Sequence, residues 1–82
     1  MFYTYVISSK IRNYVYIGLT SDVERRVEEH QKGYNKKTRV YGPFDLILFE
    51  IFKTRIDARK REKYLKSGAG KEWIKSNFLK KK

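Results

Sequence analysis

The sequence begins with two short aromatic and β-branched segments joined by a mainly polar loop, a pattern typical of a β-hairpin. The pattern predicts a first strand at residues 2–8, a loop at residues 10–13, and a second strand at residues 14–17 that ends at Gly18. Side chains alternate between the two faces of a strand, so Tyr5 and Tyr16 are expected on neighbouring strands, close enough to lie side by side. Whatever follows has to pack on this hairpin.

The residues after the hairpin carry a helix signal. Ser21 with Glu24 three positions later has the form of a capping box, which places Ser21 at the N-cap. The helix is expected to run to about Lys32 and to end at Gly33. Val23, Val27 and His30 fall on one stripe of this helix, and Arg26 lies beside that stripe.

The second half of the sequence predicts one more strand and two helices. Residues 33–43 form a basic loop, and residues 44–52 are nearly all apolar, which indicates a strand buried on both faces. Thr54 is expected to cap a helix that runs to about Lys66 and closes at Gly68, with Asp57 in its first turn. A last short helix is expected to open at Gly70 and Lys71.

The expected order is therefore β-β-α-β-α-α, a small α+β domain. We expect a three-stranded antiparallel sheet flanked by three helices, with the first strand in the centre and residues 44–52 on its other side. The 82 residues have no linker or internal repeat, apart from the short run Lys80 to Lys82, so residues 1–82 are expected to form a single domain.

Charge points to the class of partner. The chain has 20 Lys and Arg against 9 Asp and Glu, for a net charge of +11, and the whole excess lies in residues 31–82. Such a surface attracts polyanions, so nucleic acid is the expected partner, with DNA foremost. The alternatives at this point are a ribosome-associated protein or one that is merely basic; a membrane-surface role is disfavoured because no segment is a basic amphipathic helix with bulky apolar anchors.

Other compositional features exclude further classes of protein. There is no cysteine, which excludes a disulfide scaffold and a thiolate zinc site, and the single histidine excludes a His-rich metal site. No run of residues has the length and hydropathy of a membrane span, and the first residues do not resemble a signal peptide. A cytoplasmic location is therefore expected, and a monomer is assumed because nothing in the sequence fixes the oligomeric state.

Four features suggest chemistry, and each has a plainer explanation. Tyr5 and Tyr16 could form cross-strand aromatic packing alone. Gly18 could let backbone approach a phosphate near a helix N-terminus, or simply end a strand. Arg26 could be an ordinary surface arginine with a buried stem. Glu62 shares a helix face with apolar residues, where a carboxylate needs a basic partner or a metal ion.

The order and spacing of these residues resemble the GIY-YIG endonuclease family, especially its small stand-alone members of the UPF0213 type and the N-terminal nuclease domain found in excinuclease ABC. Tyr16-Ile17-Gly18 is the intact second half of the name motif, and only Tyr5 remains of the first half, in Tyr3-Thr4-Tyr5. The stretch Thr20 to His30 is close to the pattern Thr-x-Asp-Leu-Glu-Arg-Arg-Leu-x-x-His, and its second arginine is Arg26. The stretch Asp57 to Lys63 resembles the helix that carries the family's metal-binding glutamate, at Glu62.

This resemblance implies a metal-dependent endonuclease that hydrolyses phosphodiester bonds in DNA, structure-selective or weakly specific, in DNA repair or processing. It implies one Mg²⁺ or Mn²⁺ held by Glu62 and bound only with substrate, with Tyr16 as general base. The residues expected to take part in catalysis are Tyr5, Tyr16, Arg26, His30 and Asn77. The residues expected to contact nucleic acid are Gly18, Lys36, Lys37, Arg39, Arg59, Lys60 and Lys63. The alternatives are a non-catalytic basic nucleic-acid-binding module that keeps the fold, and a small ribosomal protein.

Overall fold

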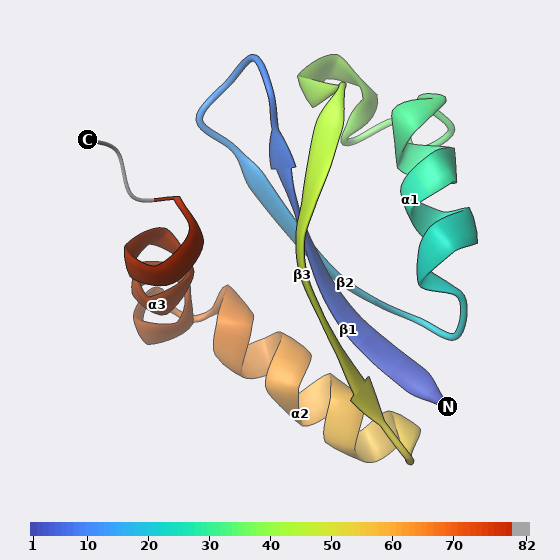
Figure 1. Cartoon of the computed structure of the whole chain (residues 1–82), viewed down its shortest axis with the longest axis vertical. Coiled ribbons are helices and arrows are strands. Elements are labelled where there is room, and N and C mark those ends of the chain that lie inside the picture. The colour runs from blue at the N-terminus through green and yellow to red at the C-terminus, as the bar shows by residue number, and fades with distance from the viewer. Residues whose placement is uncertain (80–82) are drawn as a thin grey trace.

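The computed structural model describes residues 1–79, and the run Lys80 to Lys82 lies outside them. The elements follow the expected order β-β-α-β-α-α, with one 3₁₀ turn, η1, added between α1 and β3 (Figure 1). The strands are β1 (Phe2–Ser9), β2 (Val15–Thr20) and β3 (Phe44–Phe52). The helices are α1 (Val23–Gln31), η1 (Arg39–Tyr41), α2 (Arg55–Lys66) and α3 (Gly68–Phe78). None of the helices in residues 1–79 is long and apolar enough to cross a membrane.

The sheet has the order β2-β1-β3, and both pairings are antiparallel. This confirms the expectation of a central first strand with the third strand on its other side. Helix α1 lies on one side of the sheet, and α2 and α3 lie on the other (Figure 1). The sheet is therefore the middle layer, and its two edges, β2 and β3, are open.

Each face of the sheet carries its own core, as the alternation of side chains along β1 requires. On the α1 face the buried cluster consists of Tyr5, Ile7 and Phe44, with Val27 of α1 among the residues packed on it. On the opposite face the buried cluster consists of Val6, Ile17, Leu65 and Ile74, which joins β1 and β2 to α2 and α3. Tyr5 thus belongs to the α1 side of the sheet.

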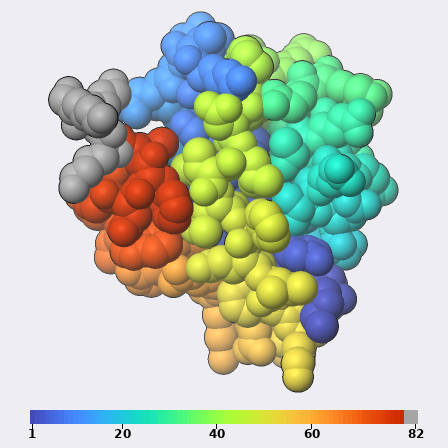
Figure 2. All heavy atoms as spheres, viewed as in Figure 1, coloured from blue at the N-terminus to red at the C-terminus, as the bar shows by residue number. Residues whose placement is uncertain are grey.

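The expectation that the third strand is buried on both faces is wrong. Leu46, Phe49 and Ile51 of β3 are 40%, 54% and 56% exposed. Figure 2 shows β3, in yellow-green, running uncovered between α3 and α1. The reason is its edge position: no strand covers its outer side, and α1, with only 9 residues, covers only part of its length. Apolar composition alone does not tell an edge strand from a central one.

Two boundaries near the first helix also differ from expectation. The N-cap of α1 is Asp22 rather than Ser21, and its Oδ1 accepts a hydrogen bond of 3.1 Å from the Arg25 backbone N–H. The Thr20 hydroxyl accepts from the Asp22 N–H at 3.0 Å, which fixes Asp22 in the capping position. The second strand does not end at Gly18 but continues to Thr20, because Gly18 is still paired with Tyr5 across the sheet.

The junction of the last two helices is tighter than expected. Thr54 caps α2 through the Asp57 N–H, as predicted, but Gly68 opens α3 instead of closing α2. Ser67 serves as the C-cap of α2 and the N-cap of α3, so no linker separates them. A Cβ on Gly70 would lie 2.5 Å from the Leu65 Cα, which shows how closely the two helices approach. This contact holds α2, and with it Glu62, against the sheet.

Candidate active site

A pocket of about 370 Å³ opens beside the outer edge strand β2, between α1 and α2. Two strands and two helices contribute to it. From the strands it is lined by Tyr5, Tyr16, Gly18 and Leu19, and from the helices by Arg26 of α1 and by Arg55, Arg59, Glu62, Lys63 and Lys66 of α2. The sheet thus supplies tyrosines and the helices supply charge.

The two tyrosines come from neighbouring strands of the hairpin, and their ring centroids lie 6.2 Å apart. Gly18 is directly opposite Tyr5 in the strand register. A Cβ at Gly18 would lie 2.6 Å from the Tyr5 hydroxyl oxygen, closer than real side-chain contacts. The glycine is therefore needed so that the Tyr5 ring can cross the neighbouring strand toward the pocket. This differs from the strand-ending role expected from its position before a helix.

A line of hydrogen bonds fixes Tyr5 from behind. Its hydroxyl lies 3.0 Å from His30 Nε2, and His30 Nδ1 lies 3.0 Å from the Thr38 hydroxyl. All three side chains are 1% exposed or less. Either neutral tautomer of His30 satisfies both contacts, because a hydroxyl both donates and accepts. His30 therefore stands behind the pocket wall and holds Tyr5, while its ring also packs on Tyr16 at 4.8 Å between centroids.

Burial decides the protonation of this line. Desolvation, with a smaller contribution from Tyr16, raises the pKa of Tyr5 to about 12, against the opposing effect of Arg26. Desolvation and the nearby Arg26 charge lower the pKa of His30. Both groups are consequently neutral near pH 7, and Tyr5 keeps its proton. Tyr5 can donate or accept a hydrogen bond in the pocket, but it is a poor proton acceptor there.

Arg26 enters the pocket from the first half of α1, one turn before His30. Its guanidinium Nη1 donates to Glu29 Oε1 at 2.9 Å, and about a third of the side chain is exposed. Only one ion pair holds it, on the same helix, so its remaining N–H groups can reach a ligand in the pocket. A planar guanidinium matches the geometry of phosphate oxygens.

Glu62 faces the pocket from α2, and its side chain is only 14% exposed. Each carboxylate oxygen has a cationic partner: Oε2 lies 3.1 Å from Lys66 Nζ, and Oε1 lies 3.4 Å from Arg59 Nε. Residues 1–79 contain no group of three His, Cys, Asp or Glu side chains that could enclose a metal ion. A single carboxylate beside an open, polar pocket fits Mg²⁺ or Mn²⁺ that takes its other ligands from water and phosphate.

Comparisons with known proteins agree with this arrangement. The model of the GIY-YIG catalytic domain matches residues 1–76. The chain belongs to the GIY-YIG family. Its members are nuclease-type domains that act on nucleic acid and generally use a divalent metal ion. This membership bears out the resemblance seen in the sequence.

The relatives are small GIY-YIG proteins. A UPF0213 protein of Clostridium perfringens is 37% identical over 67 residues, covering 80% of this chain and 71% of the relative. A UPF0213 protein of Haloquadratum walsbyi is 44% identical over 66 residues, covering 79% and 73%. The solution NMR structure of a UPF0213 protein from Bacillus halodurans superposes with a TM-score of 0.55 at 35% identity, covering 93% of this chain and 84% of that one. The fold is therefore that of a small GIY-YIG protein.

The structure gathers most of the residues proposed from the GIY-YIG resemblance, but not all of them. Tyr5, Tyr16, Gly18, Arg26, Arg59, Glu62 and Lys63 line the pocket. Lys60 lines a neighbouring hollow on the outer side of α2. Asn77 is not brought to the pocket, since its side chain donates to the Trp73 carbonyl of its own helix at 2.8 Å. The loop residues Lys36, Lys37 and Arg39 are exposed beyond the end of α1 and do not line it either.

Sequence reasoning missed three residues of this GIY-YIG site. Lys66 follows Glu62 by four positions on α2, a spacing that predicts an ion pair and could have revealed it. Arg55 lines the pocket from the first turn of α2, where helical spacing from Arg59 places it on the same side. Thr38 lies in the loop after α1, and no pattern in the sequence connects it to His30.

Proposed function

We propose that this single domain is a divalent-metal-dependent endonuclease that hydrolyses phosphodiester bonds in DNA. The observation that carries the proposal is the convergence of Tyr16, Arg26 and Glu62 on one pocket from three different elements. A nucleic-acid-binding surface needs cations but has no use for a half-buried carboxylate among them. Phosphoryl transfer, in contrast, needs a proton acceptor, a cation for the phosphate and an anchor for a metal ion within a few ångströms.

Arg26 contacts the phosphate in this proposal. The transition state of phosphoryl transfer spreads negative charge over the phosphate oxygens, and a fixed guanidinium stabilises that charge. The ion pair with Glu29 leaves Arg26 N–H groups available and orients the guanidinium from the side. Glu29 is therefore a positioning residue for Arg26 and need not touch the substrate.

The two tyrosines have different roles. Tyr5 is locked by His30 and remains protonated because burial raises its pKa to about 12, so it orients the attacking water or the neighbouring tyrosine by hydrogen bonding. Tyr16 is half-buried and lines the open side of the pocket, where it can take a proton from water. A tyrosine takes a proton only as the phenolate, and the positive charge of Arg26 favours that form.

Glu62 is the residue that would hold the metal ion. When bound, the metal ion stabilises negative charge on the phosphate and on the leaving oxygen. Glu62 alone is a weak ligand set, so we expect little metal affinity until DNA supplies phosphate oxygens. Arg59 and Lys66 compensate the carboxylate in the free protein and lie where they can turn to phosphates.

The remaining basic residues supply affinity without sequence recognition. Residues 53–79 carry nine basic and three acidic side chains, and exposed cations of this kind contact phosphates. We therefore propose a structure-selective or weakly specific enzyme that acts in DNA repair or processing.

A nicking assay on supercoiled plasmid tests the proposal. Wild-type protein with Mg²⁺ or Mn²⁺ is expected to convert supercoiled to open-circular DNA, and EDTA is expected to stop the reaction. Salt-dependent binding of the same plasmid in EDTA serves as the control that the protein is active in binding. Binding without nicking under every divalent metal ion would contradict the enzyme and favour a non-catalytic nucleic-acid-binding module.

A further inference from the structure

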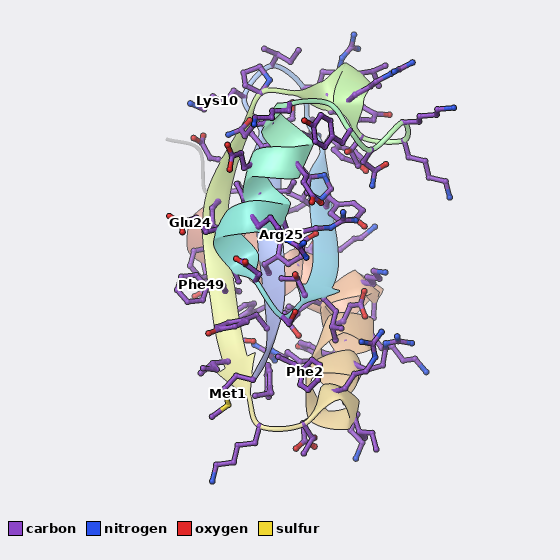
Figure 3. The ribbon with its side chains drawn as sticks, turned by 90° about the vertical axis from the view of Figure 1, so that its right-hand side faces the viewer. Met1, Phe2, Lys10, Glu24, Arg25 and Phe49 are labelled. Carbon is purple, nitrogen blue, oxygen red and sulfur yellow. The ribbon has the colours of Figure 1, made fainter. Side chains whose placement is uncertain are left out.

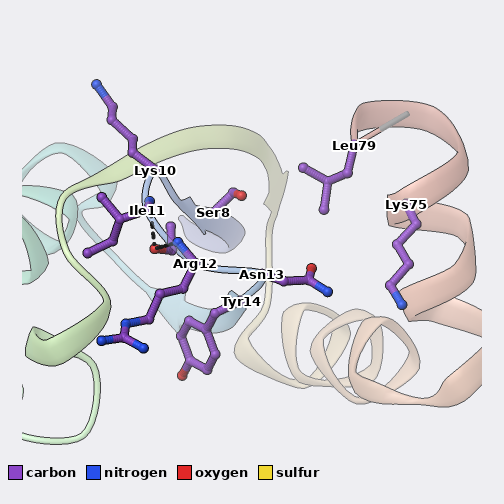
Figure 4. Close-up of a pocket in the computed structure, with 9 residues that line it drawn as sticks. Ser8, Lys10, Ile11, Arg12, Asn13, Tyr14, Lys75 and Leu79 are labelled. Carbon is purple, nitrogen blue, oxygen red and sulfur yellow. Dashed lines mark hydrogen bonds between the residues drawn. The ribbon is translucent and has the colours of Figure 1, made fainter. Parts of the chain in front are cut away.

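A second hollow, outside the candidate active site, lies between the β1–β2 hairpin loop and the end of α3 (Figure 4). Its volume is about 530 Å³. The loop residues 10–13 form one side, and Lys75 and Leu79 form the other. No acidic residue lines it, whereas three basic residues do: Lys10, Arg12 and Lys75. The hollow is therefore suited to an anion.

Two of the three cations are unengaged. The Lys10 ammonium points away from the hollow in Figure 4 and lies 3.4 Å from Asp45 Oδ1. Within residues 1–79, neither Arg12 nor Lys75 forms an ion pair with a carboxylate. The Asn13 side chain points toward the α3 side, where Lys75 lies (Figure 4). These groups are available to a ligand at no cost in internal contacts.

The hairpin loop is held in a fixed shape, so the hollow is preformed. The Ser9 hydroxyl accepts hydrogen bonds from the backbone N–H groups of Ile11 and Arg12, at 3.2 and 3.0 Å, and donates to the Tyr41 carbonyl at 2.5 Å. Tyr14, at the end of the loop, stacks on Tyr41 with 3.8 Å between ring centroids. A fixed loop loses little conformational entropy when a ligand binds.

The hollow and the candidate active site lie along the same edge of the sheet. Tyr14 directly precedes β2 and lines the hollow, whereas Tyr16, Gly18 and Leu19 of β2 line the active-site pocket. At about 3.3 Å per residue, the two sites are separated by about 7–17 Å along the strand. In a duplex with a rise of about 3.4 Å, this corresponds to about two to five base pairs.

The opposite edge of the molecule lacks this character. Leu46, Phe49 and Ile51 are exposed along β3. Glu24 of α1 lies on the same side of the molecule as Phe49 (Figure 3). Free cations are therefore concentrated along the β2 edge and not spread evenly, although the chain as a whole is strongly basic.

We propose that this hollow is a second contact for the phosphodiester backbone of the DNA whose scissile phosphate occupies the active-site pocket. Arg12 and Lys75 bind phosphates two to five nucleotides from the cleavage site, and Asn13 adds a hydrogen bond. The contact sets the direction in which the strand leaves the active site, along β2 toward the hairpin loop. It rests on the proposed function for the identity of the ligand, but it concerns binding alone.

The test is DNA binding in EDTA, where no hydrolysis occurs, with the double variant Arg12→Ser and Lys75→Ser. The matched control is Arg25→Ser and Lys53→Ser, which removes the same charge from exposed residues that line neither hollow. The slope of the logarithm of the binding constant against the logarithm of salt concentration is expected to fall by about 2 in the first variant. In the control it is expected to change by less than about 0.5, as suits distant charges.

A second measurement uses duplexes of increasing length. Wild-type and control proteins are expected to reach full affinity at a length about two to five base pairs greater than the Arg12/Lys75 variant, since the variant has lost the outer contact. Equal salt slopes in the two variants, or equal limiting lengths, would overturn the proposal. Neither result depends on nicking, so the failure of the hollow and the failure of the nuclease proposal are separate outcomes.

Discussion

The two walls of the candidate active site are built on opposite principles. The wall toward α1 is neutral and dry: Tyr5, His30 and Thr38 are almost completely buried and joined by hydrogen bonds. The wall toward α2 is charged and partly wet: Glu62 is held between Arg59 and Lys66, which are each about half exposed. One wall is fixed by the fold, and the other is held by contacts that a ligand can replace.

This difference indicates how the site can be both rigid and ready for substrate. Within residues 1–79, every buried side-chain polar atom has a hydrogen-bond partner, so the α1 wall has no reason to rearrange. Ion pairs with half-exposed lysine or arginine stabilise a protein by less than about 1 kcal/mol. DNA phosphates and a metal ion can therefore take over the partners of the α2 wall at little cost. Stability should depend on the first wall and chemistry on charged groups at the pocket.

The largest effect is expected at Arg26, the one cation that the α1 helix presents to the pocket. Arg26→Ala should reduce the nicking rate by about 10³-fold, because a positioned donor to the transition-state charge is lost. Arg25→Ala is the matched control, since it removes the same charge one residue away and outside the pocket, and should change the rate less than about threefold. The measurement is single-turnover nicking of plasmid, and equal losses in the two variants would show that only overall charge matters.

The next effect separates the two tyrosines. Tyr16→Phe should lower the nicking rate by about 10²-fold or more, the usual contribution of a general base. Tyr5→Phe should lower it by less than about tenfold, because Tyr5 keeps its proton and only orients its neighbours. The same assay at several pH values compares both variants with wild type. A greater loss in Tyr5→Phe would reverse the assigned roles.

Stability distinguishes the two walls directly. His30→Ala should lower the free energy of unfolding by about 3 kcal/mol, since it opens a cavity and leaves the Tyr5 and Thr38 hydroxyls without their buried partner. Lys66→Ala should change it by less than about 1 kcal/mol, because only an exposed ion pair is lost. Urea unfolding of both variants measures the difference. Similar losses would mean that the walls are not of different kinds.

The smallest expected effect is a pH dependence that comes from Tyr5. In the unfolded chain a tyrosine loses its proton near pH 10, whereas Tyr5 in the folded protein holds its proton until about pH 12. Raising the pH through this window therefore favours the unfolded chain, and wild type should lose about 2–3 kcal/mol more stability than Tyr5→Phe between pH 10 and 12. Below pH 10 the two proteins should show the same pH dependence in this respect. Parallel curves throughout would contradict the burial of an uncharged hydroxyl.

The sequence predicts the order of elements because capping residues and side-chain periodicity are local signals. Thr54 caps α2 as expected, and the tyrosines fall on neighbouring strands. It does not predict the exposure of β3, since burial depends on which helix covers a strand. Nor does it show that Gly18 continues the sheet, because a glycine in a strand pattern also resembles a break.

The same limit applies to the site. Arg26 and Glu62 could be identified because each lies at a characteristic position on its own helix, and the structure brings both to one pocket. The link from His30 to Thr38 joins a helix to a loop eight residues later through a side-chain contact that only the folded chain creates. Asn77 shows the converse, since a late asparagine fits the sequence pattern but is hydrogen-bonded to its own helix.

The central claim is that Glu62 serves catalysis and not merely the fold, and a matched pair of glutamates tests it most directly. Glu50 is an ion-paired, partly buried glutamate like Glu62, but it binds Arg61 at 2.8 Å and does not line the pocket. In a plasmid-nicking assay with Mg²⁺ or Mn²⁺, Glu62→Gln should nick at least about 10³-fold more slowly than wild type. Its DNA affinity should be equal or slightly higher, because a negative charge beside a phosphate is gone. Glu50→Gln should retain nicking within about threefold. Wild-type nicking by Glu62→Gln, or equal losses in the two variants, would contradict the claim.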